Sequence, residues 1–230
     1  MRASTRVQPK PPSRPRKPSS RTASPAAAPA RKAPRQIRSR ATVDAIVDAA
    51  ARVLRQDGYD GTTTNRVAEV AGVSVGSLYQ YFPNKEALVR ELLERHDRAM
   101  WTVFTDQSTC AIGRPFAEAV PAVIDALFAA HLVDPQLHQV LHQQIPRVGA
   151  LALLHATSVR SRAVVEGLLQ ARTEEHQRGD DVPTAALVVV ESVEALIHAS
   201  IALPPAQANA VQRHASELVL GYLGVARPGT

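Results

Sequence analysis

Helix-breaking residues divide the first half of this chain into short segments and constrain its fold more than any other feature. Apolar residues recur at steps of three and four over residues 43–54, which predicts one face of a helix. Gly58 should end that helix, and Gly72 should end a second, shorter one. A third helix should end just before Pro83. The folded part of the chain is therefore expected to begin with three helices joined by tight turns.

Helix-capping residues support the same division. Thr63 and Ser74 are the expected N-caps of the second and third helices, and a long fourth helix should open at Asn84. Along this fourth helix, acidic residues stand four positions before arginines, which is typical of a solvent-facing helix. Further helices are expected near residues 115–132, 135–145, 148–177, 184–202 and 205–223, the third of them with a break near Gly149–Thr157 as an alternative. The predicted fold class is all-α, with an N-terminal three-helix domain joined to a larger helical domain.

Basic residues are concentrated at the N-terminus. The chain has 230 residues with 27 Lys and Arg, and residues 1–40 hold 12 of these and no Asp or Glu. Residues 1–36 also contain eight prolines and few apolar side chains. We therefore expect a disordered basic tail that contacts phosphates weakly. An organelle transit peptide has a similar composition, but so many prolines disfavour the amphipathic helix that it needs.

The remaining composition indicates a cellular compartment. Cys110 is the only cysteine, so no intrachain disulfide can form, which fits a reducing cytosol. We find no uninterrupted run of about 18 apolar residues and no secretory signal, so no transmembrane helix is expected. The prediction is a cytoplasmic protein without a membrane partner.

Residues 63–82 predict a helix-turn-helix, in which two short helices meet at Gly72. In this motif the second helix lies in the major groove of DNA, and the first crosses above the backbone. Gly76 would let the backbone approach DNA closely, Gln80 can pair with adenine edges, and the Tyr79 hydroxyl can bond a phosphate oxygen. Similar helix pairs also occur in proteins that bind no DNA, so the bare motif does not decide the function.

The run from Thr62 to Leu88, TTTNRVAEVAGVSVGSLYQYFPNKEAL, closely resembles the DNA-binding domain of TetR-type regulators. The segment from Arg40 to about Leu93 has the usual length of that domain. The resemblance implies an all-helical homodimer that represses transcription at a palindromic operator until a small molecule binds its C-terminal domain. Together with the helix termini, it implies DNA contacts by Thr63, Thr64, Asn65, Val75, Gly76, Ser77, Tyr79, Gln80, Tyr81 and Lys85.

These inferences divide the chain into a tail (1–36), a DNA-binding domain (37–93) and an effector-binding and dimerisation domain (94–226). The expected effector pocket has six candidate lining residues, each of which could equally be plain core: Trp101, Phe104, Phe128, His131, His142 and Leu168. The last two helices have broad apolar faces that must be covered, by a second copy or within one chain. A second copy would contact Val190, Val193, Leu196, Ile197, Val211, Leu218 and Tyr222.

Other functions lack their usual signatures. His138 and His142 stand four apart on one helix, a spacing that can bind zinc, but no Cys or acidic residue completes a site. We therefore expect no metal and no cofactor. The chain shows no Gly-rich phosphate loop or nucleophile elbow, so an enzyme is not expected. The prediction is a ligand-released repressor, and the alternative is an architectural DNA-binding protein that uses the basic tail without sequence preference.

Overall fold

All regular structure in residues 32–225, the part of the chain that this computed structural model describes, is helical. Its α-helices are α1 (Lys32–Gly61), α2 (Thr64–Ala71), α3 (Val75–Tyr79), α4 (Lys85–Cys110), α5 (Phe116–His131), α6 (Pro135–Gln144), α7 (Leu151–Gln170), α8 (Val182–Ser200) and α9 (Pro205–Leu223). Two 3-10 helices, η1 (Thr173–Glu175) and η2 (Gly179–Asp181), connect α7 to α8. The predicted all-α class is confirmed.

The predicted N-cap residues stand at the starts of α2, α3 and α4. The Thr63 hydroxyl accepts a hydrogen bond from the Arg66 amide at 3.2 Å, at the start of α2. Ser74 caps α3 through the Ser77 amide at 3.1 Å, and the Asn84 side chain caps α4. Each cap satisfies an amide that has no partner inside its helix. The start of each of these helices is therefore fixed by a side chain that accepts a hydrogen bond from an amide three residues further on.

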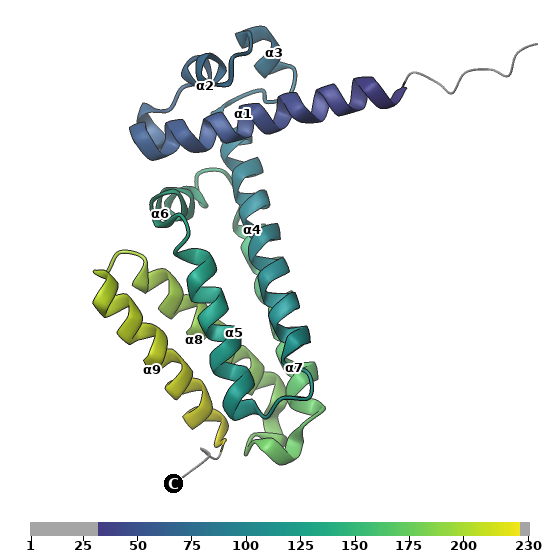
Figure 1. Ribbon diagram of the computed structural model, residues 1–230, viewed down its shortest axis with the longest axis vertical. Helices are drawn as coiled ribbons and strands as arrows, with labels where there is room; N and C mark the ends of the chain where they lie inside the picture. The colour runs from purple at the N-terminus through teal and green to yellow at the C-terminus, as the bar shows by residue number, and fades with distance from the viewer. Residues whose placement is uncertain (1–31, 226–230) are drawn as a thin grey trace, which may run out of the picture.

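Helices α1, α2 and α3 form a head at one end of the molecule (Figure 1). Its core contains Ile46, Leu54, Val67, Leu78 and Leu88, each at most 1% exposed. The last of these belongs to α4, which leaves the head and runs the length of the body, formed by α5 to α9 (Figure 1). One continuous helix thus belongs to both parts of the molecule.

Polar contacts join the head to the body around α6. The Arg55 guanidinium forms an ion pair with Asp134 at 2.8 Å, and Gln136 donates to the Arg55 carbonyl at 2.7 Å. From α4, the Arg90 guanidinium donates a hydrogen bond to the Val148 carbonyl, in the turn between α6 and α7. A movement of α6 would therefore be transmitted to both α1 and α4.

The body has its own core. Phe128 of α5 is fully buried, together with Ala186 and Ile197 of α8 and Ala215 and Val219 of α9. Helix α8 packs against α7 on one side and α9 on the other, while α5 contacts both α4 and α9. Helices α5 and α6 meet at a bend of 84°.

The beginning of α1 differs from the sequence-based prediction. The helix starts at Lys32, so residues 32–36 are helical and not part of a disordered tail. Pro34 is tolerated there because the first amides of a helix have no intrahelical partner to lose. The rest of the predicted tail, residues 1–31, lies outside the described residues. Gly58 takes a positive φ of 66° and interrupts α1 as predicted, although a short helical turn follows it.

Two other predicted helices are too long. The helix expected over 148–177 is α7, which ends at Gln170, and the alternative break near Gly149–Thr157 corresponds to a turn at Gly149, where φ is 64°, just before α7 begins at Leu151. The third helix is a single turn that ends at Tyr79, so Tyr81 lies beyond it. In both places a local turn limits the helix, although apolar residues continue beyond the turn in the sequence.

One stretch is more apolar than the sequence analysis indicated. Residues Gly179–Ser200 have a mean hydropathy of 1.5 and are long enough to cross a membrane by length and composition alone. The search for an uninterrupted apolar run missed them because Glu191 and Glu194 interrupt it. Only 33% of this stretch is buried within the chain. Helix α8 therefore has apolar surface that the described residues do not cover.

We predict opposite stability changes for two glycine substitutions. Gly72 caps α2 with a φ of 69°, whereas Gly167 lies within α7, and a Cβ at either position would meet nothing within 4 Å. Gly72→Ala should lower the free energy of unfolding by about 1–2 kcal/mol, because an L residue is strained in this conformation. Gly167→Ala should raise it by about 0.5–1 kcal/mol, because alanine favours the helix. Urea denaturation checks both values, and equal effects would contradict the backbone argument.

Candidate nucleic-acid interface and ligand cavity

The head presents α3 to solvent, supported by α2. Leu78 turns inward and is fully buried, whereas Val75 and Tyr79 are 38% and 49% exposed. The Tyr79 hydroxyl lies 3.0 Å from the Thr64 hydroxyl at the first residue of α2. This exposed contact places two hydroxyl groups of the two short helices side by side at the surface.

None of the ten predicted DNA-contacting residues is buried. Exposed residues are Thr63, Asn65, Val75, Gly76, Tyr79 and Gln80, and half-buried residues are Thr64, Ser77, Tyr81 and Lys85. They come from the start of α2, from α3 with the turn after it, and from the start of α4. The sequence therefore identified a solvent-accessible set, although contact with DNA stays a prediction.

Lys85 and Tyr81 are held by other parts of the head. The Lys85 ammonium donates to the Tyr59 carbonyl at 2.8 Å and lies 4.1 Å from the centre of the Tyr59 ring. The Tyr81 hydroxyl accepts a hydrogen bond from Ser39 of α1 at 3.3 Å, and its ring packs on the head core. Both residues thus brace the head, and the free amides at the start of α4 are the clearer anion-binding groups there.

A cavity of about 230 Å³ lies in the body, between α4, α5, α6, α7, α8 and α9. Its walls are mainly apolar, with a few polar side chains, which is the usual character of a small-molecule site. Five of the six predicted pocket residues line it: Trp101, Phe104, His131, His142 and Leu168. The prediction is wrong for Phe128, which is fully buried in the body core, where its ring fills the space between helices.

Five histidines gather at the wall of this cavity. This histidine cluster consists of His96, His131, His138, His142 and His198, with neighbouring ring centres 4.2–6.0 Å apart. Burial lowers the pKa of all five, to about 4 for His96 and His198 and to about 2 for His138. At neutral pH these rings are therefore uncharged.

Two carboxyl groups also line the cavity. Asp97 pairs with Arg160 at 3.0 Å and accepts a hydrogen bond from Thr157. Burial, followed by the nearby Glu191 charge, raises the pKa of Glu194 to about 7. Glu194 can consequently exist as a neutral acid or as a carboxylate near physiological pH, and it could donate to or accept from a bound molecule.

The predicted dimer contacts need correction. Val190, Val193 and Ile197 are buried and line the cavity, so they cannot form an outer surface. Three more, Leu196, Val211 and Tyr222, are half-buried against the body core, whereas Leu218 is 51% exposed. Helix α8 is apolar on more than one face, and its spacing alone did not show which face turns inward.

Sequence reasoning missed three important groups. His96 stands among charged residues of α4 and was assigned to a solvent-facing helix, whereas His198 and Glu194 stand in the apolar α8. A buried histidine in a charged run gives no periodic signal. The polar positions within α8 were the available clue, because a core helix buries a charge only where a partner or a site requires it.

The two parts of the chain match two related family profiles. Residues 46–92 match one described as bacterial regulatory proteins, tetR family, and residues 115–223 match one described as tetracyclin repressor-like, C-terminal domain. The chain belongs to the TetR family. The match over residues 46–92 confirms the resemblance of residues 62–88 to this family of transcriptional regulators.

Curated relatives of this TetR-family protein match over limited parts of their length. YvkB, an uncharacterised regulator of Bacillus subtilis, is 44% identical over 57 residues, which cover 25% of this chain and 30% of YvkB. The repressor KstR of Mycolicibacterium smegmatis is 37% identical over 71 residues, covering 31% and 34%. DrrR1, a repressor of Streptomyces coeruleorubidus, is 25% identical over 126 residues, covering 42% and 47%. The chain thus spans less than half the length of each of these relatives.

Solved structures match the TetR-family protein over most of its length. A TetR-family regulator from Mesorhizobium loti has a TM-score of 0.65 at 19% identity, covering 81% of this chain and 97% of that one. A regulator from Streptomyces coelicolor has a TM-score of 0.57 at 26% identity, covering 80% and 98%. SmeT, solved as a complex with triclosan, has a TM-score of 0.61 at 20% identity, covering 83% and 96%. The head and body therefore form one shared architecture.

The histidine cluster predicts that stability falls in mild acid. A histidine in the unfolded chain has a pKa near 6.5. As the pH falls from about 6.5 towards 5, the unfolded chain therefore binds protons, whereas the buried rings of the folded protein stay neutral. The melting temperature should therefore fall over this range. Glu194 acts in the opposite direction, because its raised pKa favours the folded state as the pH falls below about 7.

Two variants separate these contributions in thermal melts. His138→Gln should flatten the fall because it removes one titrating ring, and Glu194→Gln should steepen it because it removes the opposing group. A melting temperature that stays constant between about pH 7 and 5 in the unmodified protein would contradict the assignment of neutral, buried rings.

Proposed function

We propose that this protein is a homodimeric, sequence-specific DNA-binding repressor of the cytoplasm that a small molecule releases from a palindromic operator. The single observation that carries the proposal is α4, which begins in the DNA-facing head and then lines the cavity of the body.

The surface of α3 suits the major groove. Gly76 is exposed, and a Cβ there would meet only the Ser74 hydroxyl, at 4.0 Å, so the backbone is open to a close approach. Gln80 and Tyr79 offer polar groups beside it, and Val75 offers an apolar group for a thymine methyl. The backbone amides that the caps leave free at the starts of α2 and α4 can donate hydrogen bonds to phosphates on either side. These features support base contacts flanked by backbone contacts.

The cavity supports control by a small, mainly apolar ligand with one polar end. The wall combines Trp101, Phe104 and aliphatic groups with the histidine cluster and Glu194. A ligand that binds one arrangement of α4 and α6 better than another would shift the angle of the head. The triclosan complex of SmeT shows that a protein of this fold takes up such a molecule. The repressor activity in the names of KstR and DrrR1 favours repression over activation.

The outer side of α8 and α9 supports a homodimer. Leu187 and Val188 of α8 are more than one third exposed, and so is Leu203, in the connection to α9. Leu218 of α9 is half exposed, and α8 and α9 pack side by side (Figure 1). Exposed apolar surface of this kind usually marks an interaction site. A two-fold dimer also suits a palindromic operator, which requires two α3 helices on successive major grooves about 34–36 Å apart.

Sequencing of genomic fragments captured by the purified protein tests DNA recognition. We expect one palindrome with half-sites about one helical turn apart. Tyr79→Ala should weaken binding to that palindrome by about 1–3 kcal/mol, because the hydroxyl contact is lost, while the melting temperature changes little. Gly76→Ala should also weaken binding but leave the fold intact, because only DNA approaches this position.

The matched control is His155→Gln, an exposed substitution on α7 that should leave DNA binding unchanged. Fragments without a common motif, together with a steep salt dependence, would favour the architectural alternative based on the basic tail. A large loss of stability in the Tyr79 variant would show instead that its ring supports the core.

Leu218→Arg should convert the dimer to a monomer, because it places a charge in the proposed apolar interface. Analytical ultracentrifugation at several concentrations measures the change. Ile112→Arg is the control, since Ile112 is also exposed and apolar but lies beyond the end of α4. A dimer that persists in the Leu218 variant, or dissociates equally in the Ile112 variant, would place the interface elsewhere.

A further inference from the structure

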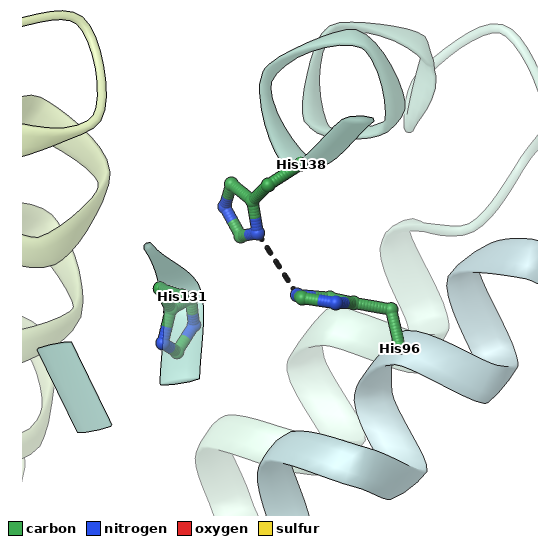
Figure 2. Close-up of side chains that lie close together, drawn as sticks. All are labelled: His96, His131 and His138. Atoms are coloured by element: carbon green, nitrogen blue, oxygen red, sulfur yellow. Dashed lines mark hydrogen bonds between the residues drawn. The ribbon is translucent and has the colours of Figure 1, made fainter. Parts of the chain in front are cut away.

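Three imidazole rings of the histidine cluster converge from three different helices (Figure 2). His96 comes from α4, His131 from the last residue of α5 and His138 from α6, beyond the 84° bend. One ring nitrogen of each lies within 4.8 Å of the others. We call these three residues the imidazole triad. The bend between α5 and α6 is the feature that brings the second and third rings together.

A hydrogen bond fixes the tautomer of the His131 ring. His131 Nδ1 lies 2.8 Å from the Leu127 carbonyl oxygen, which can only accept, so this nitrogen carries the proton and Nε2 carries the lone pair. This is the arrangement by which a second group orients a metal-binding histidine. His131 is therefore set in the tautomer that can bind a cation.

The other two rings share one proton between facing nitrogens. His138 Nδ1 and His96 Nε2 are 2.9 Å apart, so one donates to the other (Figure 2). His138 is only 6% exposed, and its Nε2 is buried without a hydrogen-bond partner among the described residues. A buried polar atom without a partner is costly and calls for an explanation. This nitrogen is not one of the two facing nitrogens, so the geometry of His138 Nδ1 and His96 Nε2, and not this atom, supports a cation.

The protonation state also suits a cation. A metal binds the neutral imidazole, and burial lowers the pKa of His96 and His138 to about 4 and about 2. The carboxylates of Asp97 and Asp134 lie near enough to His96 to oppose that effect. A bound cation would thus face uncharged rings, while the two carboxylates are held in ion pairs with Arg160 and Arg55.

We propose that His96, His131 and His138 bind a divalent transition-metal ion of the zinc type through their ring nitrogens. Two nitrogens that each lie 2.0–2.1 Å from zinc in tetrahedral geometry are about 3.3 Å apart. The His96–His138 separation of 2.9 Å is already close to this, whereas the His131 nitrogen, within 4.8 Å of the other two, must move closer to bind the same ion. Nitrogen ligands favour zinc and its neighbours over magnesium or calcium, which prefer oxygen.

Three protein ligands leave a fourth position, and the cavity lies beside it. The triad lines the cavity, and His198 stands close to His138, with 5.2 Å between ring centres. Water, His198 or a metal-binding group of a cavity ligand can complete the coordination. The ion would join α4 to α5 and α6, and folding would therefore be stabilised by its presence.

Metal titration of the full-length protein without DNA tests this proposal separately from the proposed regulation. After treatment with a chelator, isothermal titration with zinc chloride should show one ion per chain with micromolar or tighter affinity, and magnesium chloride should show none. Cobalt should give the intense visible absorption of a tetrahedral site. Zinc should raise the melting temperature. Absence of zinc binding would overturn the metal site while leaving a cavity for another ligand.

Variants assign the ion to the triad. His96→Gln and His138→Gln should each weaken zinc binding at least tenfold. The control His155→Gln, at an exposed position on α7, should leave zinc binding unchanged. Zinc binding that survives both triad substitutions, or that is lost in the control, would overturn the assignment. If a triad variant fails to fold, nitrogen NMR of the unmodified protein decides, because zinc must shift the Nε2 resonance of His131 and leave that of His155 unchanged.

Discussion

The continuity of α4 is the constraint on which the rest of the structure depends. Its first turn is fixed in the head by the Asn84 cap and by the bond from Lys85 to the Tyr59 carbonyl. Its later turns form one wall of the cavity, from Leu93 to Ala111 at its C-cap. A helix is stiff over this length because each turn is bonded to the next. Whatever occupies the cavity therefore acts on the same rigid element that carries the head.

The body combines two requirements that oppose each other. A cavity needs walls that do not collapse, and here bulky rings and branched side chains from six helices keep it open. The same walls hold five histidines and Glu194, whose desolvation works against folding. Polar groups kept in a low-dielectric wall at such a cost are characteristic of functional sites. Apolar side chains also stay exposed on the outer side of α8 and α9, where they favour binding of a partner and do not stabilise the single chain.

Much of the candidate site could be predicted where the signal was local. The ten residues proposed to contact DNA follow one another closely in the chain, and the caps that place them act over three residues. The cavity was predicted only in outline. Trp101 and Phe104 of the predicted set line it, but Phe128 was misassigned, and His96 was missed altogether. Spacing shows that a helix has an apolar face but not what that face meets.

The sequence by itself determined the family, the all-helical class and the architecture of the head, because capping and glycine conformation are properties of a few neighbouring residues. Only the tertiary structure decided which face of α8 turns inward, so that Val190 and Val193 line the cavity and Leu187 faces out. It also decided that His96, His131 and His138 meet, although 42 positions separate the first from the last. Such meetings depend on helix packing and on the bend between α5 and α6, which no local pattern encodes.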